Sequence, residues 1–262
     1  MGLLDILGTP QAFIIILLLF SFLPPILFLI WTRNTERYGR EPWLIVIKVF
    51  VWGAVFSVIV AVLVSAALFQ IYTSVAPAYV LFGSKQTLET LVLAVVIAPF
   101  VEEAAKALGV LGATSYMNKV QDGIVYGAAS GLGFSATENL FYGVAFLVEF
   151  GPRASIMLII IRSVSSTLLH ASATSATGYG IGKRAVSGGA TRVMPYYLLA
   201  VGMHASFNLL VSLSELYKGT IGDSAYLLVV AAWVFAIVAF GVARGRIMKG
   251  DRARPGQRWA SH

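Results

Sequence analysis

Two adjacent glutamates and a lysine, Glu102, Glu103 and Lys106, lie in the middle of an apolar run. The flanking residues 91–98 and 107–112 make the whole stretch long enough to cross a bilayer as a helix. A charged side chain at the centre of a membrane helix costs at least ~2.5–3.5 kcal/mol, so such residues usually face a bundle interior and mark a site. We expect one carboxylate to pair with Lys106 and the other to be free for chemistry. The i, i+4 spacing favours Glu102 as the paired one.

The composition predicts a polytopic membrane protein. Hydrophobic residues make up 58% of the 262 and charged residues 12%, with a mean hydropathy of +0.83, which places the chain outside the soluble globular class. The absence of cysteine excludes disulfides, thiolate ligands and a cysteine nucleophile. The formal charge of +7 comes from basic residues between apolar runs and in the tail. It therefore indicates membrane topology and a lipid bilayer as partner, and no nucleic acid is expected.

Apolar runs predict an all-α bundle of about seven transmembrane helices. Short connections predict antiparallel neighbours and a single integral membrane domain over residues 1–262, with catalytic helices at about 87–217 and a basic tail at about 244–262. The predicted spans are about 11–31, 43–70, 87–116, 123–148, 154–182, 193–217 and 223–245.

The basic residues also predict an orientation. If the N-terminus is outside, the inside segments hold thirteen Lys and Arg and the outside loops hold three. The positive-inside rule therefore favours N-out and C-in. The charged connection 33–42, which ends next to Trp43, is interpreted as an interfacial anchor.

Further ionisable residues lie near the midpoints of the next three predicted spans. Glu138, His170 and His204 are offset from those midpoints by only ~1.5–4 Å along the helix axis, so the three can meet Glu102 and Glu103 at one depth. Glycines 123, 127 and 131 share a face that predicts close helix packing, and Glu138 returns to nearly that face.

Two imidazoles and a carboxylate suit a zinc ion, and a further carboxylate can then act as general base. This is the composition of a metallohydrolase. The competing interpretation is a structural polar network, in which the histidines are packing residues and a glutamate pairs with Arg162. The hydroxyl side chains around His170 are interpreted as contacts between helices.

Four motifs in this order resemble the PrsW family of intramembrane proteases, a distant relative of the CAAX type II prenyl endopeptidases and the bacteriocin-processing proteins. The resemblance covers roughly residues 90–212. It rests on Glu102-Glu103-x-x-Lys106, Phe134-x-x-x-Glu138-Asn139, His170, and His204-x-x-x-Asn208.

The resemblance implies a multi-pass protease of the prokaryotic plasma membrane that hydrolyses peptide bonds of membrane-anchored proteins, with water activated by Glu102 or Glu103. By analogy with the relatives, His204 and Asn208 bind metal or stabilise the oxyanion. The leading hypothesis assigns zinc to Glu138, His170 and His204, with Lys106, Phe134, Asn139 and Arg162 in support. Family members are associated with cleavage of anti-sigma factors, so such a substrate is an expectation here.

Two alternatives use the same residues. In a metal-free glutamate protease, glutamate activates water while His and Asn hold the oxyanion. In a proton- or cation-coupled transporter, the buried Glu, His and Lys residues relay ions. The sequence has no internal repeat of the kind that many transporters show, which argues against the transporter.

Overall fold

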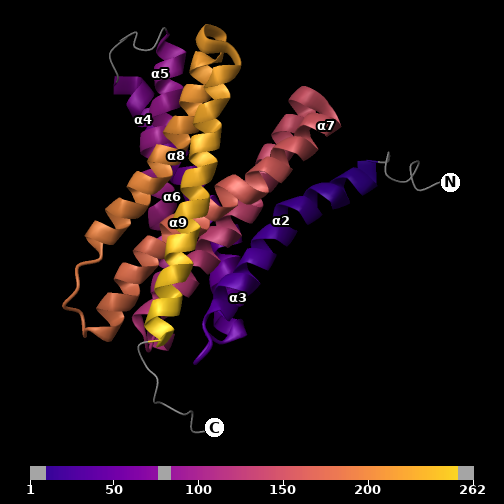
Figure 1. The fold of residues 1–262 in the computed structure, drawn as a ribbon. Coiled ribbons are helices and arrows are strands. Elements are labelled where there is room, and N and C mark those ends of the chain that lie inside the picture. The colour runs from indigo at the N-terminus through magenta and orange to yellow at the C-terminus, as the bar shows by residue number, and fades with distance from the viewer. Residues whose placement is uncertain (1–9, 76–83, 253–262) are drawn as a thin grey trace, which may run out of the picture.

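A computed structural model describes residues 10–75 and 84–252, and within these ranges the chain is helical and contains no strand. Figure 1 shows long helices that lie together at one end of the bundle, from which α2 and the labelled part of α7 diverge away from α4, α5, α8 and α9. The helices are α2 (Pro10–Thr35), α3 (Trp43–Val51), η1 (Trp52–Ser57), α4 (Val58–Val75), α5 (Lys85–Leu91), η2 (Val92–Ile97), α6 (Ala98–Leu111), η3 (Thr114–Tyr116), α7 (Val120–Val186), α8 (Met194–Ile221), η4 (Gly222–Ala225) and α9 (Tyr226–Arg252).

Helix α7 is a hairpin of two arms. Gly151 has φ 81° and ψ 178°, a conformation that favours glycine, and Pro152 follows it. The predicted break at 149–153 is therefore confirmed. Close backbone approaches pair Gly123 with Gly178, Gly127 with Thr174 and Gly131 with His170. From one pair to the next, the residue number on the first arm rises by four and that on the second arm falls by four. The two arms therefore run antiparallel.

The predicted glycine face is confirmed by these approaches. A Cβ atom at Gly178 would overlap the carbonyl oxygen of Gly123, whereas one at Gly202 in α8 would meet nothing within 4 Å. We expect Gly178→Ala to lower the unfolding temperature because two backbones must separate, and Gly202→Ala to leave it unchanged or raise it slightly. Thermal unfolding of both variants in detergent measures the difference. Equal unfolding temperatures would contradict the close packing of the two arms.

Helix α7 lies at the centre of the bundle, because α2, α3, α6, α8 and α9 all pack against it. Small residues on both arms allow these helices to approach closely. Helix α7 thus supplies the frame against which α6 and α8 place their polar residues.

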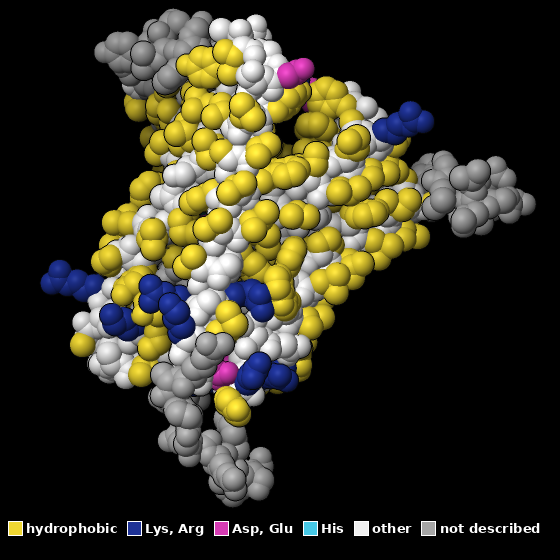
Figure 2. Space-filling model, viewed as in Figure 1, with side chains coloured by type: hydrophobic (Ala, Val, Ile, Leu, Met, Phe, Trp, Pro, Cys, Tyr) yellow, Lys and Arg dark blue, Asp and Glu magenta, His cyan; other side chains and the backbone are white. Residues whose placement is uncertain are grey.

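The outer surface is that of an integral membrane protein. Large exposed hydrophobic side chains cover the outer faces of α2, α4, α8 and α9, and Figure 2 shows a broad apolar belt. Four described stretches are long and apolar enough to cross a membrane: Ala12–Thr35, Trp43–Val75, Val120–Val186 and Met194–Asp251. The count of seven crossings and the N-out orientation stay predictions.

One end of the bundle carries the connection 36–42, the connection 112–119, the connection 187–193 and the end of α9 (Figure 1). Most of the Lys and Arg side chains visible in Figure 2 gather at this end. We refer to it as the basic end. It contains the segments for which the charge bias predicts an inside location.

Candidate active site

Lys106 lies at the centre of a buried polar cluster formed by α6, both arms of α7 and α8. Its side chain is fully buried. The Nζ atom lies 2.6 Å from Oε1 of Glu103, 3.6 Å from Oε2 of Glu102 and 2.9 Å from Nδ1 of His170. The ring of Phe134 covers it, with Nζ 4.4 Å from the ring centroid. Lys106 and Phe134 thus lie beside the ionisable groups, and their supporting roles stay predictions.

The two adjacent glutamates have different surroundings. Glu103 is fully buried, and its Oε1 lies 3.0 Å from Nδ1 of His204 as well as beside Lys106. Its Oε2 accepts a hydrogen bond of 2.9 Å from the hydroxyl of Thr174. Glu102 is less enclosed, and its Oε2 is a buried atom with no hydrogen-bond partner among the described residues. One carboxylate is therefore held on all sides, whereas the other has an oxygen with ion-pair neighbours but no hydrogen bond.

This division reverses the expected pairing. The i, i+4 rule favoured Glu102 as the partner of Lys106, but Glu103 is closer by 1.0 Å, from the distances of 2.6 and 3.6 Å. Both spacings allow contact on an isolated helix. His204 and Thr174, which come from other helical segments, hold Glu103 in place and so decide between the two.

Glu102, His170 and His204 form a group that could hold a metal ion. One ligand atom from each lies within 4.8 Å of the others. The two imidazole rings meet edge to face with centroids 4.7 Å apart. Oε2 of Glu102 lies 3.8 Å from Nε2 of His204. The predicted meeting of intramembrane residues from separate helices at one level is confirmed for these three.

Glu138 lies on the side of His170 opposite Lys106, where it contacts Arg162 and His170. Its Oε2 accepts a 2.7 Å hydrogen bond from Arg162 Nη2 and lies 2.9 Å from Nε2 of His170. Arg162 also donates from Nε to Oδ1 of Asn139 at 3.0 Å. Arg162 therefore pairs with a carboxylate, one of the two roles expected for it, and Asn139 orients it. The structure brings Glu102, and not Glu138, into the group with both histidines.

Asn208 lies apart from this cluster, beside a wide helical turn. Its Nδ2 donates a 2.8 Å hydrogen bond to the carbonyl oxygen of Ala94 in η2, the π-helical turn that precedes α6. Pro99, which has no backbone N–H, follows this turn. A π-turn changes the phase of the helix after it, here the helix that carries Glu102 and Glu103. The predicted role of Asn208 at the oxyanion stays a prediction.

Comparison with known proteins identifies the protein class. A model described as the PrsW family intramembrane metalloprotease matches residues 41–240, about three quarters of the chain. The chain belongs to this family. It is also 28% identical over 189 residues to Protease PrsW of Clostridioides difficile (strain 630), which covers 71% of this chain and 73% of that protein. No solved structure matches.

Family membership makes this PrsW protein an intramembrane peptidase. The transporter hypothesis is therefore set aside. The matched region contains every residue of the polar cluster. All four motifs that suggested the family lie in that region.

Sequence reasoning missed Thr174 as a site residue of this PrsW protein. It was grouped with the hydroxyl residues that join helices, yet it binds Glu103 directly. The available signal was its position four residues after His170, which puts both side chains on the same helix face. Ser166, four residues before His170, likewise accepts a 3.2 Å hydrogen bond from Arg162.

Proposed function

We propose that this PrsW protein cleaves a peptide bond of a membrane-anchored protein by means of a water molecule activated by Glu102. The observation that carries the assignment is the difference between the two glutamates. Glu103 is saturated by Lys106, His204 and Thr174, whereas the Oε2 atom of Glu102 has no hydrogen-bond partner among the described residues. A general base must have a free oxygen to accept a proton from water.

In this proposal Glu103 is a positioning residue. Its contact with Nδ1 of His204 fixes the imidazole orientation and leaves Nε2 facing Glu102. Lys106 balances the charge of Glu103 within the bundle. Glu102 accepts the water proton and later returns it to the leaving amine, as expected for a base that becomes the acid in the second step.

The donor set of Glu102, His170 and His204 fits a zinc ion, whose binding would replace one of the two contacts that the ring nitrogens of His170 make. Ligand atoms about 2 Å from a tetrahedral zinc are roughly 3.3 Å apart, close to the separation of Glu102 Oε2 and His204 Nε2. Oε2 of Glu102 would then be the ligand atom, and the oxygen left to accept the water proton would be Oε1 of the same carboxylate. A metal bound there would supply Lewis-acid polarisation of the substrate carbonyl and lower the pKa of bound water. Glu138, the third ligand expected from the sequence, is engaged by Arg162 and His170.

A metal-free glutamate protease is the second candidate, and one observation favours it. Both ring nitrogens of His170 have partners, Lys106 at Nδ1 and Glu138 at Nε2, each at 2.9 Å. Lys106 also places a positive charge beside Glu102 and Glu103 without a metal ion. In this mechanism His204 donates a hydrogen bond to the oxyanion while Glu102 remains the base.

Metal analysis of purified protein separates the two candidates. We expect about one zinc per chain in the wild type and none in His170→Ala or His204→Ala, because the loss of one of three ligands leaves the site incomplete. Glu138→Gln serves as the matched variant and should retain zinc if Glu102 is the third ligand. Stoichiometric zinc in the double variant His170→Ala, His204→Ala would support the metal-free mechanism.

The cellular setting is part of the proposal. The distribution of basic residues supports N-out, C-in insertion into a prokaryotic plasma membrane, with the basic end in the cytoplasm. Membrane-anchored anti-sigma factors are the substrate class that the family resemblance suggests. A generic single-span reporter protein, reconstituted with the protease in lipid vesicles, tests cleavage without requiring the natural substrate.

A further inference from the structure

A second cluster of carboxylates lies at the basic end, outside the spans that contain the active site. Glu36 follows α2, Glu41 precedes α3 and Asp122 lies in the first turn of α7. Their exposed fractions are 0%, 3% and 1%. One carboxylate oxygen from each lies within 4.8 Å of the others. Three acidic groups removed from water at such short range repel one another unless a positive charge lies among them or a carboxyl group is protonated.

Lys119 supplies part of that charge. Its Nζ donates to Oε1 of Glu36 and lies 3.6 Å from Oδ1 of Asp122. It also donates to the carbonyl oxygens of Tyr38 and Gly39 at 3.1 and 3.0 Å. A cation is therefore already surrounded by oxygen atoms here. Arg33 also faces Glu36 and Glu41, yet Lys119 is the only cation with an ion pair to the cluster among the described residues.

Oxygen atoms without hydrogen bonds remain in the cluster. Oε2 of Glu36 and Oδ1 of Asp122 are buried and have no hydrogen-bond partner among the described residues. The other oxygen of Asp122 accepts from the backbone N–H groups of Asn118 and Lys119 at 2.7 and 2.8 Å, which fixes the carboxylate. Glu41 accepts from the hydroxyl of Tyr126. The cluster is thus held rigidly and is incompletely satisfied, as a site for a further cation requires.

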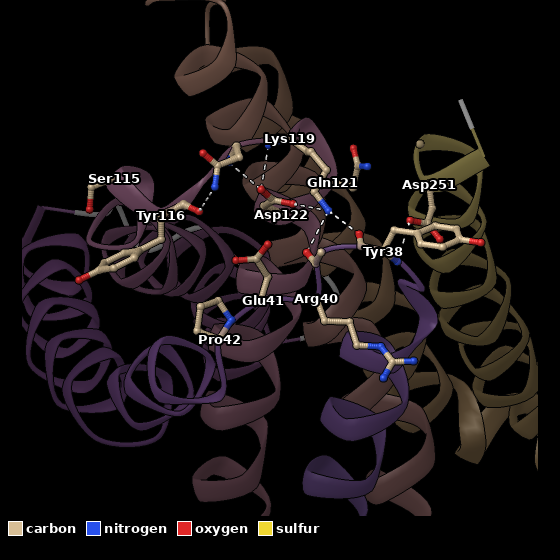
Figure 3. A pocket seen from close by; sticks show the side chains of 13 residues that line it. Tyr38, Arg40, Glu41, Pro42, Ser115, Tyr116, Lys119, Gln121, Asp122 and Asp251 are labelled. Carbon is tan, nitrogen blue, oxygen red and sulfur yellow. Dashed lines mark hydrogen bonds and ion pairs between the residues drawn. The ribbon is translucent and has the colours of Figure 1, made fainter. Parts of the chain in front are cut away.

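An open cavity gives access to the cluster. It has a volume of about 770 Å³, and Glu41, Lys119 and Asp122 are among the residues that line it. Figure 3 shows Glu41 and Asp122 close together on its wall. An ion from the aqueous phase at the basic end can therefore reach two of the three carboxylates without passing through the bundle.

We propose that Glu36, Glu41 and Asp122 bind a hard divalent cation of the Ca²⁺, Mn²⁺ or Mg²⁺ class at the basic end. All the available ligands are oxygen atoms, which these ions prefer. Two oxygens on opposite sides of a Ca²⁺ ion at 2.3–2.6 Å are roughly 4.6–5.2 Å apart, so a cluster within 4.8 Å has the right size for the larger of these ions. The two positive charges would also offset the mutual repulsion of the three carboxylates.

A bound ion would join two segments that are far apart in the chain. Glu36 and Glu41 lie in the connection between α2 and α3, and Asp122 lies in the first turn of α7, the helix around which the bundle is built. We therefore expect the cation to stabilise the folded protein by mass action.

Mn²⁺ is the probe, because the free ion gives an EPR signal. The decrease of that signal when the full chain is added in detergent measures how much Mn²⁺ is bound. We expect the wild type to bind one Mn²⁺ that Ca²⁺ or Mg²⁺ displaces. Asp122→Asn and Glu36→Gln should each weaken binding by at least about tenfold. Glu89→Gln is the matched control, since Glu89 pairs with Lys85 at an i, i+4 contact on α5, far from the cluster, and it should bind as the wild type does.

Lys119→Met keeps the test decisive if the acidic variants fold poorly. Removal of the competing ammonium should tighten Mn²⁺ binding by about tenfold or more and increase the rise in unfolding temperature that Mn²⁺ produces. His204→Ala shows which of the two clusters binds the Mn²⁺. It disrupts the intramembrane cluster and should leave Mn²⁺ bound at the basic end. The proposal is overturned if the wild type binds no Mn²⁺, if Lys119→Met binds no more tightly, or if His204→Ala removes the ion while Asp122→Asn retains it.

Discussion

Glu102→Gln is expected to slow cleavage of a single-span reporter at least ~10²-fold, the scale of a lost general base. Its unfolding temperature should remain close to that of the wild type, because Oε2 of Glu102 makes no hydrogen bond to the described residues that the substitution could remove. Initial cleavage rates in proteoliposomes, together with thermal unfolding in detergent, measure both effects on the same preparation.

Glu103→Gln is the matched variant on the neighbouring residue. It should lose activity and also stability, because the neutral amide leaves Lys106 without its closest counter-charge and cannot accept equally well from His204 and Thr174. If both variants cleave the reporter at the wild-type rate, the two glutamates have a structural role and no catalytic one. If Glu103→Gln is stable and inactive while Glu102→Gln is active, Glu103 is the general base and Glu102 is the positioning residue.

Lys106→Met is expected to destabilise the fold by ~3–5 kcal/mol, the cost of breaking a buried ion pair from one side. The methionine side chain has a similar length, so packing against Phe134 is retained while the positive charge is lost. Glu103 then stays buried with only hydrogen-bonding neighbours. The difference in unfolding free energy between variant and wild type in detergent measures the effect.

The double variant Lys106→Met, Glu103→Gln shows whether the loss comes from the unpaired charge. We expect it to unfold at a higher temperature than Lys106→Met, because both charges of the pair are then absent and the two effects are not additive. Lys85→Met, which breaks an exposed pair with Glu89, should change stability by no more than ~1 kcal/mol. If Lys106→Met unfolds like the wild type, Lys106 is not the charge partner that its position indicates.

Helical periodicity and hydropathy were sufficient to predict several structural features of this protein. The cost of intramembrane charge identified Glu102, Glu103, His170 and His204 as members of one interior cluster. The glycine spacing predicted the tight face of α7, and the polar break at 149–153 predicted the turn at Gly151. These features follow from the sequence because each depends on the local face or length of a helix, which residue spacing determines.

Tertiary structure decided the partners within that cluster. Helical spacing allowed Lys106 to reach either glutamate, and contacts from His204 and Thr174 favoured Glu103. The sequence allowed Arg162 to pair with a glutamate without indicating which one, and the approach of the two arms of α7 gave it Glu138. Such choices depend on which helices approach one another and at what rotation, and residue spacing within one helix does not contain that information.

The carboxylate cluster at the basic end is the clearest case. In the sequence, Glu36 and Glu41 belong to a charged connection interpreted as an interfacial anchor, and Asp122 lies about eighty residues further along. Only the packing of the connection between α2 and α3 against the start of α7 brings the three together and buries them. An exposed charged turn and a buried ion site can have the same local sequence, because burial is set by the segments that cover the turn.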